Sequence, residues 1–531
     1  MRTFSPTWAL AALIMLGAGV FSVLAQETAP AAAVQSAKGD KPSSLTPADQ
    51  VAVTSGSVAV GGKALAYTAT TGYLPLKEEG GKLRANIFHV AYTLKESGVR
   101  GQGSEANPAT QAAGSSTQPS AARPVTFVFN GGPGAAAVWL HLGTAGPQRI
   151  DIPADGSPPK APYTLVENEF TWLPSTDLVF VDPVNTGYSR AASSEIAKEF
   201  FGVKEDIAGM GEFVRLWLTK NQRWNSPIFL AGESYGTTRA AGLSDHLQQK
   251  HGITVSGVIL ISTVLNFATL SPQEGNDLPY VVYLPGYTAL AHHHGKIKGD
   301  RAKLLLEAEE FASSDYVVAL TKGASLPEEQ REKIAARVAA LTGLTKAYVR
   351  ESDLRIPPSR FMKELLREQQ KIIGRFDGRL AGAQTDAVND SAEWDPSFDG
   401  FFTAYSGAIN DYVRKTLKYE NDVSYEVLTN KVHPWNYGGG GFNGYLYVGD
   451  SLRDAMSRNP RLQLLVAAGW YDLATPYYGA DYTVNQLGLA KELRKNITQT
   501  YYPAGHMMYH ERTSLAQLQK DIAALIQKAT R

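Results

Sequence analysis

The sequence predicts an α/β fold with a doubly wound, mostly parallel sheet, and three observations support it. Short apolar runs alternate with amphipathic helix patterns between residues 125 and 261, which is typical of parallel strands covered by helices on both faces. Residues 51 to 94 hold β-branched and aromatic runs separated by Gly61-Gly62 and Gly80-Gly81, which predicts N-terminal antiparallel strands with glycine turns. The strand pattern then resumes at Leu462, after a long and mostly helical interval.

The first 25 residues have the pattern of a secretory signal peptide. Arg2 precedes an apolar stretch that ends in Val23-Leu24-Ala25, so we expect cleavage after Ala25. An uncleaved membrane anchor is the alternative, and it is less favoured because a polar, Ala-rich segment follows at Gln26. Residues 26–50 contain almost no large apolar residue, which predicts a disordered leader.

The cysteine count and the net charge limit the compartments and the partners that the protein can have. The chain has no cysteine, so it forms no disulfide and cannot carry a lipid on an N-terminal cysteine. Together with the export signal, this favours a bacterial periplasm or the medium, without stable membrane association after cleavage. Lys+Arg and Asp+Glu are balanced at 51 each, so no basic excess is available for nucleic acid, which we exclude as a partner.

The pentapeptide Gly232-Glu233-Ser234-Tyr235-Gly236 is the only G-x-S-x-G in the sequence. It lies between the apolar run 228–231 and a helix-forming stretch, and this strand-turn-helix setting is the one that a nucleophile elbow requires. The glycines leave room for a sharp turn in which the serine hydroxyl is exposed. The alternative is a structural turn serine, but the flanking pattern favours a catalytic Ser234 and an α/β-hydrolase fold.

An α/β-hydrolase fold accounts for this sequence as one domain that is split by an insertion. We expect the first part of the hydrolase domain over residues 51–267, a largely helical cap insertion over 268–444, and the second part over 445–531. Helices are predicted over 327–341 and 360–373 in the cap, and over about 479–493 in the second part. A cap at the C-terminal edge of the sheet would roof a site there.

A serine nucleophile needs a base and an orienting carboxylate, and in this fold they follow in the order Ser, Asp or Glu, His, each after a later strand. Asp472 follows the apolar run 462–467, and His506 follows the run 497–502. His510 is a rival to His506, but we expect a solvated surface histidine there. Asp182 is a rival to Asp472, but it precedes the serine.

Other features bear on cofactors and on the oxyanion. His292-His293-His294 could suggest a metal, but successive side chains diverge and no cysteine accompanies them, so we expect no metal and no cofactor.

The amide of Tyr235, directly after the serine, is one expected oxyanion donor. A second donor is expected from the loop Asn130-Gly131-Gly132-Pro133-Gly134, whose alternative interpretation is a plain tight turn.

These pieces together resemble the serine carboxypeptidase family, peptidase family S10. Asn130 to Gly134 is similar to its NGGPG loop, and Gly232 to Gly236 reproduces its GESYG. The segment 181–189 resembles its D-x-P-V-G-T-G-F-S sequence, and Gly505-His506-Met507 resembles its GHM. The four motifs occur in the family's order and span the hydrolase portion, whereas no such motif matches the cap.

The resemblance implies a role for each matched residue. Ser234 would be the nucleophile, His506 the base and Asp472 the orienting residue. The amides of Gly132 and Tyr235 would form the oxyanion hole. In the family, the loop asparagine and the glutamate before the serine help to bind the free C-terminal carboxylate of the substrate. In this chain those substrate-binding residues would be Asn130 and Glu233.

Two positions depart from the family pattern. The family has a second glutamate shortly before a Gly-Pro, where this chain has Thr144, and a tryptophan two residues before the loop asparagine, where this chain has Val128. Without the partner carboxyl, Glu233 would lose the like-charged neighbour that keeps its proton on. We expect carboxylate recognition to be weakened or rebuilt with a cation, Arg149 or Arg239, and activity to be less confined to acid pH.

The leading prediction is therefore an exported serine carboxypeptidase that acts on peptides with a free C-terminus through an acyl-enzyme. An exported esterase or acyltransferase with the same triad is the alternative, since the fold does not choose between amide and ester substrates. A non-catalytic peptide-binding protein is a third, less favoured interpretation. The sequence leaves side-chain preference and oligomeric state open.

Overall fold

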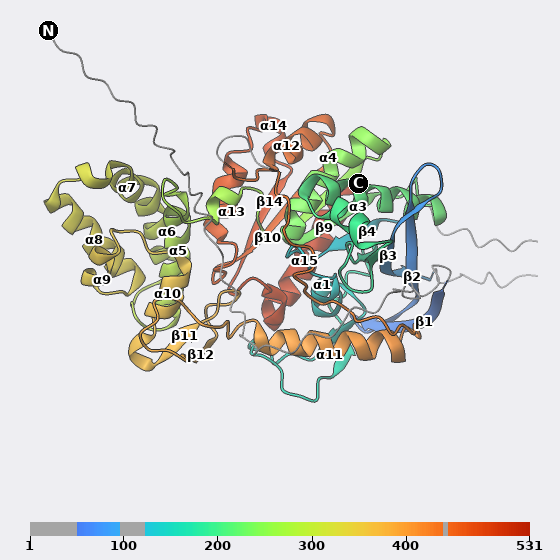
Figure 1. Cartoon of the computed structure of the whole chain (residues 1–531), viewed down its shortest axis with the longest axis horizontal. Coiled ribbons are helices and arrows are strands. Elements are labelled where there is room, and N and C mark those ends of the chain that lie inside the picture. The colour runs from blue at the N-terminus through green and yellow to red at the C-terminus, as the bar shows by residue number, and fades with distance from the viewer. Residues whose placement is uncertain (1–49, 96–122, 439–443) are drawn as a thin grey trace, which may run out of the picture. The chain divides into compact units, whose positions relative to one another are not determined.

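The computed structural model describes residues 50–95, 123–438 and 444–531, all within one compact unit that runs from Thr46 to Arg531 (Figure 1). The expected signal peptide and the expected leader up to residue 49 lie outside the described residues, so both stay predictions. Within the described ranges, no helix is long and apolar enough to cross a membrane.

A ten-stranded sheet forms the centre of this unit, in the order β1-β2-β3-β7-β4-β9-β10-β13-β14, with β8 paired to β3. β1, β2, β3 and β7 pair antiparallel, and every pair from β7 through to β14 is parallel. The predicted fold class, a mostly parallel sheet with N-terminal antiparallel strands, is confirmed. The strands are β1 (Val51–Val60), β2 (Lys63–Lys77), β3 (Leu83–Leu94), β4 (Val125–Phe129), β7 (Asp177–Val181), β8 (Arg190–Ala191), β9 (Ile228–Ser234), β10 (Val255–Thr263), β13 (Gln463–Gly469) and β14 (Ile497–Tyr502).

The central strands are buried on both faces because their alternate residues point into two separate hydrophobic cores. In β4, Val128 packs into one core, while Phe127 and Phe129 pack into the other. Helices lie on both faces of the sheet (Figure 1) and contribute side chains to both cores, as the doubly wound pattern predicts. The Val128 core is covered by α11 (Asp399–Lys415) and α15 (Arg512–Ala529), and the Phe127 core by α3 (Val203–Lys220), α4 (Tyr235–His251), α12 (Gly449–Arg458) and α13 (Tyr477–Asn485).

The interval 268–444 contains two parts that pack differently. Its first part forms a third hydrophobic core of its own, which Tyr471 and Leu473 join from the loop after β13. Its second part includes α11, which packs on the sheet core instead. The cap boundaries at 268 and 444 therefore stay a prediction. The elements of the first part are α5 (Leu278–His293), α6 (Arg301–Phe311), α7 (Val317–Lys322), α8 (Glu328–Thr342), α9 (Lys346–Glu351), α10 (Pro358–Glu364) and the hairpin β11 (Lys371–Ile373) and β12 (Ala381–Ala383).

Two predicted helices are wrong in part. The helix expected over 360–373 ends at Glu364, because Lys371–Ile373 pairs with β12 and buries Ile372 and Ile373. The helix expected over about 479–493 is interrupted between α13 and α14 (Lys491–Arg494), where Gly488 has a positive φ of 67°.

The remaining short elements connect these layers. Among the described residues they are α1 (Val138–Leu140), two π-helical turns (His141–Ala145 and Ala312–Tyr316), the hairpin β5 (Gln148–Ile150) and β6 (Leu165–Glu167), α2 (Ser194–Ala197), and single 3₁₀ turns at Lys198–Phe200, Phe267–Thr269, Gly323–Ser325, Arg367–Gln369 and Met508–His510.

Candidate active site

Ser234 lies at a sharp turn between β9 and α4, as the G-x-S-x-G pattern predicts. Its backbone has φ 58° and ψ −129°, a strained conformation for a residue other than glycine. The flanking glycines are needed because a Cβ on Gly232 would lie 2.0 Å from the Gly236 carbonyl oxygen, and one on Gly236 would lie 2.6 Å from that of Phe129. The backbone thus has the geometry of a nucleophile elbow.

Asp472 and His506 meet as a buried, hydrogen-bonded pair after β13 and β14. His506 Nδ1 lies 2.7 Å from Asp472 Oδ2. The carboxylate also accepts bonds from the amides of Ala474 and Thr475 and from the Thr475 hydroxyl, at 2.7, 2.9 and 2.7 Å. With Nδ1 turned to the aspartate, the buried Nε2 of His506 has no hydrogen-bond partner in the described residues. That nitrogen is therefore available as a base.

The serine and the histidine are brought to the same edge of the sheet by β10. Ser234 is opposite Thr263 in the register of β9 and β10, and the neighbouring Ser262 hydroxyl donates to the His506 carbonyl at 2.6 Å. Among the described residues, no hydrogen bond joins the Ser234 hydroxyl to His506. Such bonds often form only when substrate closes the site.

His510 and Asp182, the rivals of His506 and Asp472, are buried and hydrogen-bonded to other parts of the chain. His510 is buried, not solvated as expected; its ring stacks on Phe401 at 4.0 Å, Nε2 lies 3.0 Å from the Tyr405 hydroxyl, and burial lowers its pKa to about 3. Asp182 accepts bonds from the Ala137 amide and the Tyr425 hydroxyl, and burial raises its pKa to about 7. Neither residue forms a hydrogen bond to Ser234 or His506 within the described chain.

The glycine-rich loop after β4 packs directly against the elbow. A Cβ on Gly131 would lie 2.5 Å from the Tyr235 amide nitrogen and 2.8 Å from the Glu233 carbonyl oxygen, so only glycine permits this approach. Gly132 follows with φ 99°, in the region that glycine favours. The loop and the amide of Tyr235 are therefore adjacent, which is the arrangement that two oxyanion donors require.

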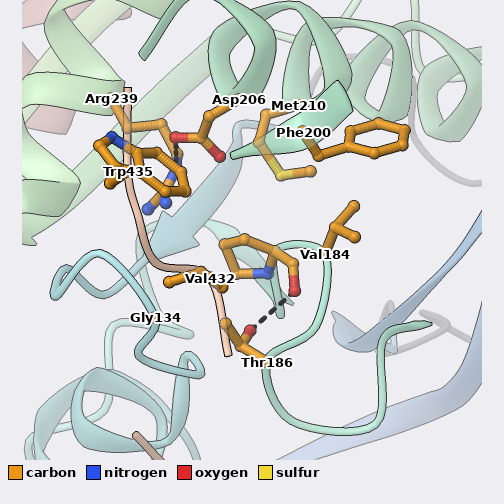
Figure 2. A pocket seen from close by; sticks show the side chains of 10 residues that line it. Gly134, Val184, Thr186, Phe200, Asp206, Met210, Arg239, Val432 and Trp435 are labelled. Atoms are coloured by element: carbon orange, nitrogen blue, oxygen red, sulfur yellow. Dashed lines mark hydrogen bonds and ion pairs between the residues drawn. The ribbon is translucent and has the colours of Figure 1, made fainter. Parts of the chain in front are cut away.

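A buried ion pair supports this loop from behind, and sequence reasoning missed it. Arg239 Nε donates to Asp206 Oδ2 at 2.8 Å, and Nη1 donates to the Asn130 carbonyl at 2.7 Å; the two side chains are 1% and 4% exposed. Figure 2 shows the pair beside Trp435, at a cavity of about 10 Å³ that Gly134 also lines. Arg239 thus links the glycine-rich loop after β4 to α3.

This arrangement corrects the expectation that Arg239 or Arg149 receives the substrate carboxylate. Arg239 is committed to Asp206 and Asn130. Arg149 pairs with Glu169 at 3.3 Å and donates to the carbonyl of Ile150. The sequence shows the charge of each arginine, but only the structure shows that both already have partners.

Glu233 is buried next to the elbow, with one oxygen bound and one free. Oε1 accepts a hydrogen bond from the Asn130 side-chain amide at 3.1 Å, and Oε2 has no partner in the described residues. Burial raises the pKa of Glu233 to about 7, although the charge of His506 and the phenol of Tyr509 oppose the shift. The absence of the partner carboxyl therefore does not leave the pKa of Glu233 low, because desolvation raises it. Activity that is less confined to acid pH stays a prediction.

Two tyrosines pack against Gly143, which directly precedes Thr144 in the chain. A Cβ on the neighbouring Gly143 would lie 2.5 Å from the ring of Tyr509 and 2.6 Å from the Tyr405 hydroxyl. The Tyr509 hydroxyl lies near enough to Glu233 for each to shift the pKa of the other, without a hydrogen bond of ordinary geometry. The Tyr509 hydroxyl and Thr144 Oγ1 are buried, and neither has a partner among the described residues.

The strand order and the elbow define an α/β-hydrolase fold. The family model of serine carboxypeptidases (Peptidase_S10) matches residues 113–520, more than half of the chain. The chain therefore belongs to the serine carboxypeptidase family, a family of serine-type hydrolases.

Curated relatives match over shorter stretches. The chain is 28% identical over 176 residues to serine carboxypeptidase-like 16 of Arabidopsis thaliana, which is 32% of this chain and 33% of that protein. It is 28% identical over 154 residues to a carboxypeptidase Y homolog of Arthroderma benhamiae, which is 28% of each. The chain thus spans about a third or less of the relatives that it matches.

Solved structures show a more distant similarity. A proline iminopeptidase of Mycobacterium smegmatis aligns with 90% of this chain and 99% of its own, at 12% identity and a TM-score of 0.32. A carboxyl esterase of Bacillus coagulans aligns with 87% and 99%, at 12% identity and a TM-score of 0.34.

Proposed function

We propose that this protein is an exported serine carboxypeptidase that removes C-terminal residues from peptides. The Ser234 hydroxyl attacks the scissile carbonyl as His506 Nε2 takes its proton, and Asp472 orients the imidazole and stabilises its charged form. The amides of Gly132 and Tyr235 bind the oxyanion. The C–N bond then breaks as His506 protonates the leaving amine, and water hydrolyses the acyl-enzyme by the same base.

One observation supports this proposal above the others. The buried Asp472–His506 pair leaves Nε2 free at the sheet edge where Ser234 is held in a strained turn. A strained nucleophile, an oriented base and an adjacent glycine loop are the parts that acyl transfer needs.

The choice of a free C-terminus depends on Glu233. With a pKa near 7, the carboxyl is protonated in mildly acidic solution and can donate a hydrogen bond to a substrate carboxylate. Asn130 fixes its other oxygen, and the unpartnered Tyr509 hydroxyl supplies a second donor. We infer that this phenol replaces the second carboxyl of the family pattern, so carboxylate recognition is rebuilt with a neutral donor instead of a cation.

The test of the reaction class uses a fluorophosphonate probe and an N-blocked dipeptide with a free C-terminus. We expect the wild-type protein to be labelled and to release the C-terminal residue, and Ser234→Ala to lose both properties. Thr237→Ser, on the same turn of α4, is the control and keeps both. Labelling that persists in Ser234→Ala would rule out the assigned nucleophile, and hydrolysis of an aryl ester without any peptide hydrolysis would favour the esterase alternative.

Export is a separate part of the proposal. We infer that residues 1–25 are removed on secretion, because the sequence around Ala25 suits signal peptidase. The N-terminal sequence of the protein recovered from the periplasm or medium should begin at Gln26. A mature chain that retains Met1 would contradict cleavage.

A further inference from the structure

A second cavity, of about 540 Å³, lies between the cap and the segment that directly precedes Asp472. Its volume falls in the range of sites that take small molecules. None of the residues that line it is a proposed triad, oxyanion or carboxylate-binding residue. The end of α5 and the start of α6, which pack side by side (Figure 1), form one side, and the segment after β13 forms the other; the lining includes His292, Asp300, Arg301, Leu305, Trp470 and Tyr471.

Arg301 presents an unused positive charge to this cavity. Its guanidinium stacks on the ring of Trp470 at 4.2 Å, and Nη1 donates to the Tyr471 hydroxyl at 3.2 Å. No carboxylate of the described residues pairs with it. A guanidinium held over an indole ring keeps N–H donors that the protein does not use, and its planar fork suits bidentate binding of a carboxylate.

Asp300 presents the opposite charge to the same cavity. Its Oδ1 caps α6 by accepting the Lys303 amide at 3.0 Å, and within the described chain no cation pairs with its carboxylate. Leu305 and the Trp470 ring supply apolar surface beside the two charges. The neighbouring histidines at 292–294 do not form a metal site with these charges. His292 Nε2 is hydrogen-bonded to the Gly299 carbonyl, and no group of three metal-ligating side chains occurs among the described residues.

We propose that this cavity binds a free α-amino acid with an apolar or aromatic side chain. The α-carboxylate binds Arg301, the α-ammonium group binds Asp300, and the side chain packs against Leu305 and Trp470. A ligand with one charge alone would leave Arg301 or Asp300 unpaired. Binding there does not depend on the triad, although the product of the proposed carboxypeptidase belongs to the same ligand class.

The test is calorimetric titration of the full chain carrying Ser234→Ala with L-phenylalanine. We expect one site, and a roughly tenfold or greater loss of affinity in Arg301→Met and in Asp300→Asn, because each removes a charged hydrogen-bonding partner. N-acetyl-L-phenylalanine and L-phenylalaninamide, which lack the ammonium and the carboxylate, should bind similarly weakly. Glu233→Ala, which alters the proposed catalytic cleft, should leave the affinity for L-phenylalanine unchanged.

Several outcomes would overturn the proposal. They are the absence of any binding at millimolar L-phenylalanine, equal affinity in Arg301→Met, or a loss of binding in Glu233→Ala that places the ligand in the catalytic cleft. Arg301→Lys separates charge from folding, because it should retain more affinity than Arg301→Met. Since hydrolysis is not measured, failure of the carboxypeptidase proposal would leave these titrations unaffected.

Discussion

Two groups of polar side chains flank Ser234, and they differ in how fully their hydrogen bonds are formed. On the reaction side, both oxygens of Asp472 are bound and the Nδ1 of His506 is bound to one of them, whereas His506 Nε2 has no partner in the described residues. On the binding side, Glu233 Oε2 and the Tyr509 hydroxyl are buried without partners in the described residues. Unpaired buried polar atoms are costly, so they are the places where a polar ligand gains most.

The comparison suggests a division of roles. The Asp472–His506 pair of the reaction side is assembled before substrate arrives, which limits reorganisation during the chemical step. The binding side is completed only by the substrate, because its free donors have nothing else to bind. Changes on the first side should therefore lower kcat, and changes on the second should alter selectivity for a free C-terminal carboxylate.

The largest effect is expected from Asp472→Asn. The amide cannot hold the imidazole in the required tautomer, and by analogy with other Ser-His-Asp hydrolases kcat should fall about 10⁴-fold with little change in KM. Steady-state kinetics on an N-blocked dipeptide measure both values. Asp481→Asn, a change to a half-buried carboxyl that accepts hydrogen bonds from Gln499 and Tyr501 of β14, is the control and should keep kcat within a small factor. If Asp472→Asn lowered kcat/KM mainly by raising KM, that result would contradict the division of roles.

The next effect is expected from Arg239→Met, which leaves Asp206 buried without its cation. Breaking a buried pair in this way typically costs about 3 to 5 kcal/mol of stability. The Asn130 carbonyl also loses its donor, so labelling by the fluorophosphonate probe should slow. Arg149→Met is the matched control, because its partner Glu169 is 35% exposed and can be solvated. Equal shifts of the urea midpoint in the two variants would contradict the supporting role of Arg239.

A smaller and more selective effect is expected from Glu233→Ala. Loss of a charged hydrogen bond to the substrate should lower kcat/KM about 10- to 100-fold for a dipeptide with a free carboxylate, and much less for its C-terminal amide. Glu233→Gln is the control, since its amide can still donate but does not titrate. Equal losses on both substrates would show that Glu233 does not recognise the carboxylate.

The same residue predicts a linkage between pH and stability. Its folded-state pKa, about 7, lies above its ordinary value of 4.5, so the native state binds more protons than the unfolded state between these values. Stability should therefore fall as pH rises from about 4.5 to about 7. Glu233→Gln should lose this part of the pH dependence when thermal unfolding is followed across that range. If the dependence of stability on pH were the same in Glu233→Gln as in the wild type, another group would be responsible for the titration.

The smallest effect is expected from Tyr509→Phe. Removal of one neutral donor should lower kcat/KM for the free-carboxylate substrate about fivefold, and the change should appear as higher KM. Because the hydroxyl has no partner within the described chain, stability should hardly change. Tyr412→Phe, which removes a buried hydroxyl bound to that of Tyr92, is the contrasting control and should lower stability without altering substrate preference.

Local motifs and strand order predicted where Ser234, Asp472 and His506 lie in the fold, and their catalytic roles stay a prediction. Each of these positions is marked by its own neighbours in the sequence. Glycines flank Ser234, and apolar strand patterns directly precede Asp472 and His506. The binding side could not be read in this way, because Tyr509 approaches Glu233 from 276 positions later in the chain and nothing near it marks the contact. The role of Arg239 was missed for the same reason, since Asp206, its partner, lies on another helix.

The most direct test of the account is the ratio of kcat/KM for an N-blocked dipeptide to that for its C-terminal amide, measured between pH 5 and 8.5. If protonated Glu233 receives the substrate carboxylate, the ratio should be well above one in mildly acidic solution and should fall as pH rises through about 7. A ratio of one or less at every pH would contradict the assignment of carboxypeptidase activity.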